Sequence, residues 1–443
     1  MKTGILRPPR EAKMEVLVRQ IPIAREAMPA PRAQIPAKSF LTPGEPNIRC
    51  NRTESPEQYA GCAVTFAFLA EGAANAVFQL RPSSEKAGLN VLFRDENGSP
   101  IPHARLLNKV LRVSKGIPKT LPYSEIISGY ENVIHPLFRT KLPSPPPAQN
   151  QAQPPSSRNT QEIASFEDYL MDDEGVRLNQ EIITHLHAQM HGDQCASGPC
   201  ATVPNMELYG ILLPDMSSIP NQALTIEIKP KWLAQSPTAP RDAFQCRTCA
   251  MQRLRNKQGK RKRDPYICPL QLVAGNTPAI EKYVRHRVAQ EMSGTNKAAA
   301  DFDMEPVVQR VTAYLATGPG HTLLEFLRTL QSKHDDVGVT MRPATPPRLA
   351  TSVPTSNMAD YDHRLRLAMT LRDCSFFIRI SFADPDMPIE AKLCDLDFKS
   401  ADKIEVWWDK EKRLINGGWY TSVEPGTTCA VTEAWRTNCP WYV

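Results

Sequence analysis

The stretch Ala223-Leu-Thr-Ile-Glu-Ile-Lys-Pro-Lys231 predicts a β-strand whose two faces differ in chemistry. Because side chains alternate between the faces of a strand, three aliphatic residues share one face: Leu224, Ile226 and Ile228. The opposite face carries one carboxylate and two ammonium groups: Glu227, Lys229 and Lys231. The apolar face is expected to pack in a core. Charges that alternate with aliphatic residues also occur in any half-solvated sheet, so this pattern alone does not define a site.

A second stretch, Ile389-Glu-Ala-Lys-Leu-Cys-Asp-Leu-Asp-Phe-Lys399, shows the same alternation. It is expected to place Asp395 and Asp397 on one face of a strand, with Leu396 and Phe398 on the other. Paired carboxylates suit Mg²⁺, which binds proteins through one or two carboxylates together with substrate phosphates. Asp395 and Asp397 are therefore the candidate metal ligands.

The composition is that of a globular protein of two to three domains. The chain has 443 residues, of which 41% are apolar and 23% charged, and its net charge of +6 is mild. Eleven cysteines without regular spacing do not form a disulfide framework, and no apolar signal segment follows Met1. We therefore expect a reduced, intracellular protein of the nucleus or cytoplasm. The longest apolar run, Ala63 to Ala70, is too short to span a bilayer, so no membrane anchor is expected.

Three regions are expected along the chain. Residues 1–50 are rich in proline and predict a disordered tail. Residues 51–214 predict a first lobe with a mixed sheet, interrupted by a low-complexity insertion at 143–160. Residues 215–443 predict a larger α/β second lobe, with a core helix at 306–315 and leucines at helical spacing from 323 to 330. In the first lobe, strands are expected at 64–69, 76–80, 109–114 and 208–213. The fold class is a two-lobed α+β enzyme with a cleft between the lobes.

Other segments add polar candidates to the two strands. Small residues in a loop between strands let backbone N–H groups approach phosphate closely, and this loop is Gly72, Ala73, Ala74 and Asn75. Arg112, flanked by apolar residues on a strand, suits a contact to nucleotide phosphates or lies at a solvated edge. Asp215 lies in the expected hinge 214–218 and is assigned to the nucleotide. Asp373, between an expected helix at 362–370 and an apolar strand, either accepts a hydroxyl proton or caps a turn.

Two clusters of potential zinc ligands are incomplete. Cys246 and Cys249 with Cys268 lack a fourth ligand, and the second cluster comprises His185, His187, His191 and Cys195. Neither has a full ligand set at accepted spacing, so packing is the favoured interpretation and zinc the alternative. The basic run 252–263 contains seven cations and no acid. It predicts a solvated loop with a nuclear-import signal, and the alternatives are a nucleic-acid patch or a polyphosphate collector.

Taken together, nine segments occur in the order seen in inositol-pentakisphosphate 2-kinases, and the chain resembles that family over residues 59 to 420. The segments are the loop 71–75, Val110-Leu-Arg-Val113, Glu227-Ile-Lys-Pro-Lys231, Cys246-Arg-Thr-Cys249 with Met251, Tyr266-Ile-Cys-Pro-Leu270, Gly275-Asn276, Leu330-Gln331 with Asp336-Val-Gly338, Met369-Thr-Leu-Arg-Asp-Cys-Ser375 and Asp395-Leu-Asp-Phe-Lys399. An ordered set of this size is far more specific than any one motif.

The resemblance implies a kinase of the inositol polyphosphate kinase type. Such an enzyme transfers the γ-phosphoryl group of ATP, with Mg²⁺, to the 2-hydroxyl of inositol 1,3,4,5,6-pentakisphosphate and produces phytate. By position, Asp373 resembles the base on that hydroxyl, and Lys229 the cation that neutralises the transferred group. Glu227 and Arg112 fall on nucleotide-side positions, and Asp395 on that of the Mg²⁺ ligand. Residues 71 to 75 match the loop over the phosphates.

The same resemblance assigns the substrate side and marks departures from the family. Substrate positions match Lys231, Asn276, Lys399, Lys403, Trp407 and, more distantly, Arg177. Lys403 replaces an arginine, Trp407 a tyrosine and Ala279 a further arginine. The zinc ligands of part of the family, two histidines flanking a cysteine pair, have no counterpart, because no cysteine lies between Cys268 and Cys374.

Two alternatives remain at this point. One is an inositol polyphosphate kinase of another positional specificity. The other is a nucleic-acid-binding protein built on the cysteine pair and the basic run, although it lacks the interleaved aromatic residues that stack on bases. The expected partners are ATP and the inositol phosphate, without membrane or nucleic acid, and the expected state is a monomer.

Overall fold

The computed structural model describes the chain from residue 46 to residue 438 with eight gaps. The described ranges are 46–83, 89–116, 121–139, 165–191, 207–260, 266–293, 303–341, 355–422 and 428–438. The predicted tail up to residue 45 and the insertion 143–160 lie outside these ranges. Strand β1 begins at Ile48, so residues 48–50, which we assigned to the tail, belong to the folded part.

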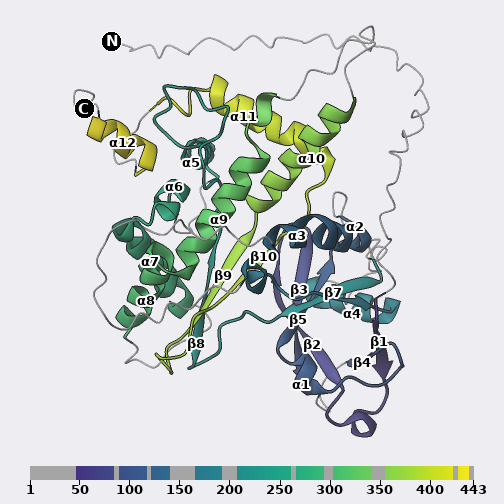
Figure 1. Cartoon of the computed structure of the whole chain (residues 1–443). Coiled ribbons are helices and arrows are strands. Elements are labelled where there is room, and N and C mark those ends of the chain that lie inside the picture. The colour runs from purple at the N-terminus through teal and green to yellow at the C-terminus, as the bar shows by residue number, and fades with distance from the viewer. Residues whose placement is uncertain are drawn as a thin grey trace, which may run out of the picture. The chain divides into compact units, whose positions relative to one another are not determined.

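Seven strands close into a barrel in the order β1-β4-β2-β3-β5-β7-β6 (Figure 1). They are β1 (Ile48–Thr53), β2 (Val64–Glu71), β3 (Asn75–Pro82), β4 (Asn90–Arg94), β5 (Lys109–Ser114), β6 (Glu174–Arg177) and β7 (Tyr209–Pro214). Neighbouring strands pair antiparallel, except that β1 and β6 pair in parallel. Closure removes the exposed edges that an open sheet would present.

The sheet is mixed, as expected, because it contains one parallel pair among antiparallel ones, but its closure into a barrel was not predicted. We predicted β2, β3, β5 and β7 from their apolar runs, and all four are present. Closure depends also on β1, β4 and β6, which we did not predict from the sequence. Strand β6 is only four residues long and contains Gly175, so it carries almost no alternation of its own. Its place is set by its pairing with β1 and β7.

Alternating apolar side chains fill the inside of the barrel. Phe66, Phe78 and Phe93 are buried there, and helix α4 (Gln180–His191) adds Ile182 and Leu186 to the same cluster. Short helices complete this half of the chain: α1 (His103–Leu106), α2 (Tyr123–Gly129) and α3 (His135–Phe138), the last two joined by a π-helical turn at Tyr130–Ile134.

A second sheet is antiparallel, with the order β10-β9-β8. Its strands are β8 (Ala223–Ile228), β9 (Ser375–Ser381) and β10 (Glu390–Cys394). The predicted apolar face of β8 is confirmed, because Leu224, Ile226 and Ile228 are all fully buried. The strands are shorter than predicted: β8 ends before Lys229, and β10 ends before Asp395.

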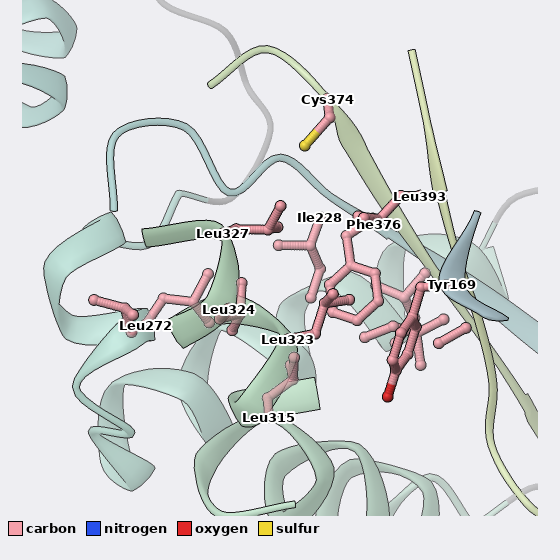
Figure 2. Close-up of a cluster of buried hydrophobic side chains, with 14 of the residues drawn as sticks. Tyr169, Ile228, Leu272, Leu315, Leu323, Leu324, Leu327, Cys374, Phe376 and Leu393 are labelled. Atoms are coloured by element: carbon pink, nitrogen blue, oxygen red, sulfur yellow. The ribbon is translucent and has the colours of Figure 1, made fainter. Parts of the chain in front are cut away.

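Helices supply the other side of this core, and Figure 2 shows their leucines facing the sheet. Those that contribute to it are α6 (Pro269–Val273), α7 (Thr277–Ser293), α8 (Glu305–Ala316), α9 (Pro319–His334) and α10 (Thr355–Leu371). The other helices of this half of the chain, α5 (Arg247–Lys257), α11 (Ile404–Asn416) and α12 (Ala430–Asn438), pack in smaller clusters. Leu315 of α8 and Leu323, Leu324 and Leu327 of α9 pack with Ile228 and Phe376 of the strands. The two core helices predicted here are confirmed. Among the described helices, none combines the length and apolar character needed to cross a membrane.

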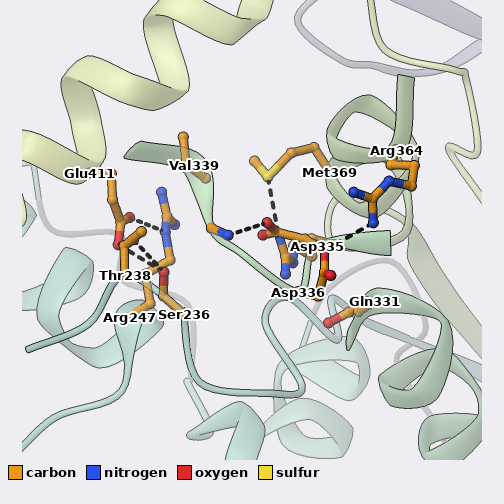
Figure 3. Close-up of polar contacts among 12 residues, drawn as sticks. Ser236, Thr238, Arg247, Gln331, Asp335, Asp336, Val339, Arg364, Met369 and Glu411 are labelled. Carbon is orange, nitrogen blue, oxygen red and sulfur yellow. Dashed lines mark hydrogen bonds and ion pairs between the residues drawn. The ribbon is translucent and has the colours of Figure 1, made fainter. Parts of the chain in front are cut away.

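Two buried ion pairs flank the indole of Trp232, which directly follows Lys231. Arg247 pairs with Glu411 at 2.8 Å, and Arg372 pairs with Asp335 at 2.5 Å. The guanidinium carbons lie 4.2 and 3.5 Å from the indole centre, so both arginines make cation–π contacts with one ring. Figure 3 shows the two carboxylates at the centres of separate hydrogen-bond groups, with Ser236 and Thr238 also donating to Glu411.

The amide of Gln331 links three parts of the chain. Gln331, on α9, is fully buried. Its Nε2 donates to the carbonyl oxygens of Lys231, at 2.9 Å, and Leu371, at 3.3 Å. Its Oε1 accepts from the N–H of Leu233 at 3.0 Å. One side chain thus holds the segment after β8 against the end of α10.

We expect Gln331→Leu to lower the free energy of unfolding by about 2 to 5 kcal/mol, because three backbone groups lose their partner while the volume is kept. Urea denaturation followed by tryptophan fluorescence measures this change. Gln309→Leu, on the exposed face of α8, is the control and should stay within about 0.5 kcal/mol of the parent. Equal effects of the two substitutions would contradict the role of the amide.

Candidate functional site

The charged face predicted for β8 lies beside the start of β9. Lys229 Nζ donates to Ser375 Oγ at 2.7 Å and lies 3.1 Å from Glu227 Oε1. Ser375 donates in turn to Glu227 at 2.7 Å. Asp395 Oδ2 is 3.7 Å from Lys229 Nζ, so the predicted nucleotide-side carboxylates meet the same ammonium group. Ser375 is an addition that the sequence pattern did not suggest.

The electrostatics of this group favour its charged state. Burial alone would lower the pKa of Lys229, but the charges of Glu227 and Asp395 outweigh it and raise the pKa. Burial alone would likewise raise the pKa of Glu227, but the hydrogen bond from Ser375 and the charge of Lys229 lower it. Lys229 therefore presents a full positive charge beside the ionised carboxylate of Glu227.

Asp373 lies between two lysines. Its Oδ1 accepts from Lys231 Nζ at 2.9 Å, and its Oδ2 is 3.2 Å from Lys399 Nζ. Partial burial would raise the pKa of Asp373, but the attraction of the two lysines and their hydrogen bonds outweigh it and lower the pKa to about 2. More than half of the side chain is exposed, so the carboxylate remains accessible from solvent.

The backbone around Asp373 and Lys231 is fixed by the buried groups described above. Asp373 lies between the end of α10 and the start of β9, as predicted, and its N–H bonds to the carbonyl of Thr370. Arg372, the preceding residue, stacks on Trp232, which follows Lys231. Asp373 and Lys231 thus project from two segments that are joined by the buried contact between Arg372 and Trp232.

Two of the site residues have left-handed backbone conformations. Lys231 has φ of 59° and Asp395 has φ of 58°. This conformation is uncommon for residues other than glycine, although aspartate tolerates it better than most. At Asp395 it ends the strand, so Asp395 and Asp397 do not share a strand face as we predicted. The kink instead brings Asp395 toward Lys229.

Arg112 of β5 contacts Asp397. The two groups form a bidentate pair, with Nη1 donating to Oδ1 at 2.9 Å and Nη2 donating to Oδ2. Asn75, with its amide oriented so that its oxygen faces the guanidinium, also accepts from Arg112 at 2.7 and 3.2 Å. The predicted phosphate contact and the predicted second metal ligand therefore bind each other in this structure. Of the two aspartates, Asp395 has the more exposed side chain.

A pocket opens beside this pair. Its lining is mostly apolar and is contributed by the following residues: Ile126, Tyr130, Met171, Ile211, Leu213, Leu393, Cys394 and Leu396. Arg112, Asp173, Asp395 and Asp397 add the charged part of the lining. Burial and the nearby Glu131 and Asp172 raise the pKa of Asp173 to about 6. Sequence reasoning missed Asp173, because the pattern around it contains only a run of acidic residues.

The small-residue loop and Asp215 flank the barrel strands of the pocket. Gly72, Ala73 and Ala74 form the turn between β2 and β3, closed by a bond from the N–H of Gly72 to the carbonyl of Asn75. Asp215 directly follows β7. Its side chain accepts from Gln79 at 3.1 Å, and its carbonyl accepts from Arg379 at 2.7 Å. The predicted hinge is thus bonded both to β3 and to β9.

Further cations lie near Asp373. Burial and the cations Arg247, Arg255 and Lys403 lower the pKa of Lys410, against the attraction of Asp373. Lys410 lies on α11, seven residues after Lys403, and so returns to the same helix face. That spacing is the signal by which the sequence could have identified it. Lys231, Lys399 and Lys410 thus lie within electrostatic reach of one carboxylate, Asp373.

Three predicted substrate residues have other surroundings. Trp407 is 8% exposed and packs with Trp232, Ile404 and their apolar neighbours. Asn276 precedes α7, and its Oδ1 accepts from the N–H of Ala279, so it caps that helix. Arg177 ends β6 as an exposed residue opposite Arg49 and Tyr209. Their roles toward the substrate stay predictions.

The basic run is a loop only in part, although its residues 255–260 are exposed as we predicted. Its first part, up to Lys257, is the end of α5. Arg253 bonds to Ser422, and both Arg253 and Lys257 lie over the ring of Trp419. Residues 261–263 lie outside the described ranges. These intramolecular contacts take up cations that the nucleic-acid alternative required.

The histidine cluster is described only in part. His185 and His187 lie on α4, and His185 contacts Gln189 at 2.8 Å. Cys195 and the side chain of His191 lie outside what the structure describes.

Comparison with known proteins gives two matches. The sequence pattern of the family described as inositol-pentakisphosphate 2-kinase matches residues 68–413. An inositol-pentakisphosphate 2-kinase of Yarrowia lipolytica (strain CLIB 122 / E 150) is 32% identical over 213 residues. That alignment covers 47% of this chain and 57% of the relative, so the chain spans little more than half the length of the curated relative it matches. The family match covers most of the chain and every charged cluster of the site, and the chain belongs to the inositol-pentakisphosphate 2-kinase family.

Proposed function

We propose that this protein transfers the γ-phosphoryl group of ATP to the 2-hydroxyl of inositol 1,3,4,5,6-pentakisphosphate and so forms inositol hexakisphosphate. The observation that carries the proposal is the position of Asp373, an exposed carboxylate between Lys231 and Lys399. A carboxylate there can accept a hydroxyl proton, while the lysines bind the phosphates that flank the hydroxyl. Family membership supports the choice of substrate.

On the nucleotide side, we assign the base of ATP to the apolar pocket beside Arg112 and its phosphates to the turn Gly72–Ala74 and Lys229. Asp173, with its pKa near 6, is suited to bond a polar group of the nucleotide as donor or acceptor. We assign Asp395 as the first ligand for Mg²⁺, because its side chain is exposed and carries oxygen donors. Asp397 is the second, because each of its carboxylate oxygens keeps one lone pair beyond the hydrogen bonds from Arg112. A bound Mg²⁺ would neutralise phosphate charge.

The proposed chemistry depends on positioning and charge neutralisation rather than on a covalent intermediate. Lys229 lies between the nucleotide-side carboxylates and the Asp373 cluster, where it can stabilise charge on the transferred group. Lys231 and Lys399 hold the pKa of Asp373 low. Phosphates of the inositide compete for these lysines, so substrate binding raises the basicity of the carboxylate that has to accept the proton.

We further propose that the barrel and the second sheet act as the two lobes of an inositol polyphosphate kinase, with Asp215 in the connection. We also propose an intracellular location, on the basis of the irregular cysteine spacing in the sequence. The location of this protein in the nucleus or the cytoplasm stays a prediction.

The proposal is tested by incubating the purified chain with labelled ATP, Mg²⁺ and a panel of inositol phosphates that differ in the free hydroxyl. We expect turnover with the pentakisphosphate whose 2-hydroxyl is free, and much less with isomers in which that position is phosphorylated, because Asp373 has no hydroxyl to deprotonate there. Preferential turnover of another isomer would show that a hydroxyl other than the 2-hydroxyl is phosphorylated, while the protein would still be an inositol phosphate kinase.

Asp373→Asn should lower kcat by about 10²- to 10⁴-fold, the usual contribution of a positioned base. Inositide binding should be kept or tightened, because the substitution removes a negative charge between two phosphate-binding lysines. Steady-state kinetics and calorimetric titration measure the two effects. Asp386→Asn, in the exposed β9–β10 turn, is the control and should match the parent. Unchanged kcat in Asp373→Asn would disprove the assignment of the base.

Lys410→Met should raise KM for the inositide about 10- to 100-fold with little change in kcat, because a charge-assisted bond to a non-reacting phosphate contributes about 1.5 to 3 kcal/mol to ground and transition states alike. The control is Lys412→Met. Lys412 lies on the same helix but over the ring of Trp408, 3.6 Å from its centre. If both variants behave alike, the effect is one of net charge on α11 and Lys410 has no specific role.

A further inference from the structure

Ser375 lies at the centre of the charged groups on the nucleotide side, although it carries no charge itself. It begins β9 and is 1% exposed. Its Oγ lies 2.7 Å from Lys229 Nζ and 2.7 Å from Glu227 Oε1. Asp395 Oδ2 lies 3.4 Å from the same oxygen. One buried hydroxyl thus contacts all three of these ionisable groups.

The direction of the hydrogen bonds of Ser375 follows from its neighbours. An ammonium group can only donate, an ionised carboxylate can only accept, and a hydroxyl has one proton together with its lone pairs. The pKa of Lys229 is raised and that of Glu227 is lowered, so both groups are charged. The hydroxyl proton of Ser375 is therefore directed to Glu227, and a lone pair accepts from Lys229.

These contacts restrain the ammonium group of Lys229. It has three N–H donors. One donates to Ser375, and a second faces Glu227 Oε1 at 3.1 Å. Asp395 Oδ2, at 3.7 Å, lies beyond hydrogen-bond distance, so the third N–H is left for another acceptor. The end of a long and flexible side chain is thus held at two of its three donors.

We propose that Ser375 is a positioning residue for phosphoryl transfer, which holds the ammonium group of Lys229 so that one N–H points to the transferred group. The inference rests on the proposed function, because it concerns the role assigned there to Lys229. Ser375 itself need not touch nucleotide or inositide. A donor that is oriented before the reaction stabilises the charge of the transition state without the cost of reorganisation.

The backbone of Ser375 is suited to this role. Ser375 belongs to β9, the middle strand of the second sheet, and pairs with Cys394 of β10. The next residue, Phe376, pairs with Ile228 of β8, which directly precedes Lys229. Both strand partners therefore fix the hydroxyl relative to the ammonium group, and a side chain with one rotatable carbon–carbon bond adds little freedom of its own.

The other end of β9 offers a matched control for a buried serine with a purely structural role. Ser381 is 6% exposed. Its hydroxyl bonds to the carbonyl oxygen of Gln222 at 3.3 Å and accepts from the N–H of Asp384 at 2.9 Å. Neither partner is a charged group of the candidate site. Removal of either hydroxyl from β9 costs buried hydrogen bonds, but only that of Ser375 is bonded to Lys229.

The test compares Ser375→Ala with Ser381→Ala in the full chain, by steady-state kinetics with ATP, Mg²⁺ and the pentakisphosphate and by thermal melts. We expect both variants to lower Tm. Only Ser375→Ala should lower kcat, by about 10- to 100-fold, because it removes a hydrogen bond to a charged group. KM for the inositide should stay within about twofold of the parent, because Lys229 acts on the transferred group. Ser375→Thr keeps the hydroxyl and should recover most of kcat. Equal kcat in the two alanine variants would overturn the proposal.

A double-mutant cycle with Lys229→Met separates positioning from an independent effect of Ser375. If Ser375 acts through Lys229, Ser375→Ala should not lower kcat further once the ammonium group is gone. Additive losses would overturn the proposal. Should Ser375→Ala fail to fold, Ser375→Cys, which keeps the volume and bonds only weakly, takes its place in both comparisons. Turnover by the parent with equal or additive effects would overturn this inference alone, whereas a folded parent without turnover would overturn the proposed function and this inference with it.

Discussion

The side-chain amide of Gln331 is the constraint on which the backbone of the proposed substrate site depends. Its three hydrogen bonds join the carbonyls of Lys231 and Leu371 and the N–H of Leu233. Lys231 contributes its own ammonium group to the site, and Leu371 lies two residues before Asp373. A buried amide satisfies both kinds of backbone group at once, which no apolar side chain can do. The distance between the carboxylate of Asp373, the proposed base, and the ammonium group of Lys231, the proposed phosphate ligand, is therefore set by a buried residue that belongs to neither group.

Two buried ion pairs also hold the backbone segment that carries Trp232 and Lys231. Arg247 and Arg372 lie near the same indole, and each is neutralised by its own buried carboxylate. Buried ion pairs add little net stability, because desolvation offsets most of their attraction. Their geometry is demanding, however, since a displaced arginine would leave a carboxylate buried alone. We interpret the arrangement as one that selects a single position for Trp232 and hence for Lys231.

Local patterns predicted those parts of the structure that depend on local alternation. The faces of β8, the core leucines of α9 and the junction at Asp373 follow from period and from neighbouring residues. Features that depend on distant contacts were not predictable. Strand β6 has too few residues to show a period, and Cys429, which completes the predicted cysteine cluster as a fourth member, follows Cys268 by 161 residues. The pairing of Arg112 with Asp397 joins residues far apart in the chain, so each was assigned separately to the nucleotide or the metal.

Lys231 and Asp395 both have left-handed backbone angles, and of the three described non-glycine residues with positive φ they are the two in the site. Glycine would adopt this conformation without strain, which is of order 1 kcal/mol or more at such positions. Selection for folding alone would favour glycine or asparagine at both places. Sequence redesign guided only by thermostability would therefore tend to remove together the ammonium group that we propose to bind phosphate and the carboxylate that we propose to bind Mg²⁺. The two positions are where stability and activity call for different residues, and libraries meant to stabilise this protein should leave them fixed.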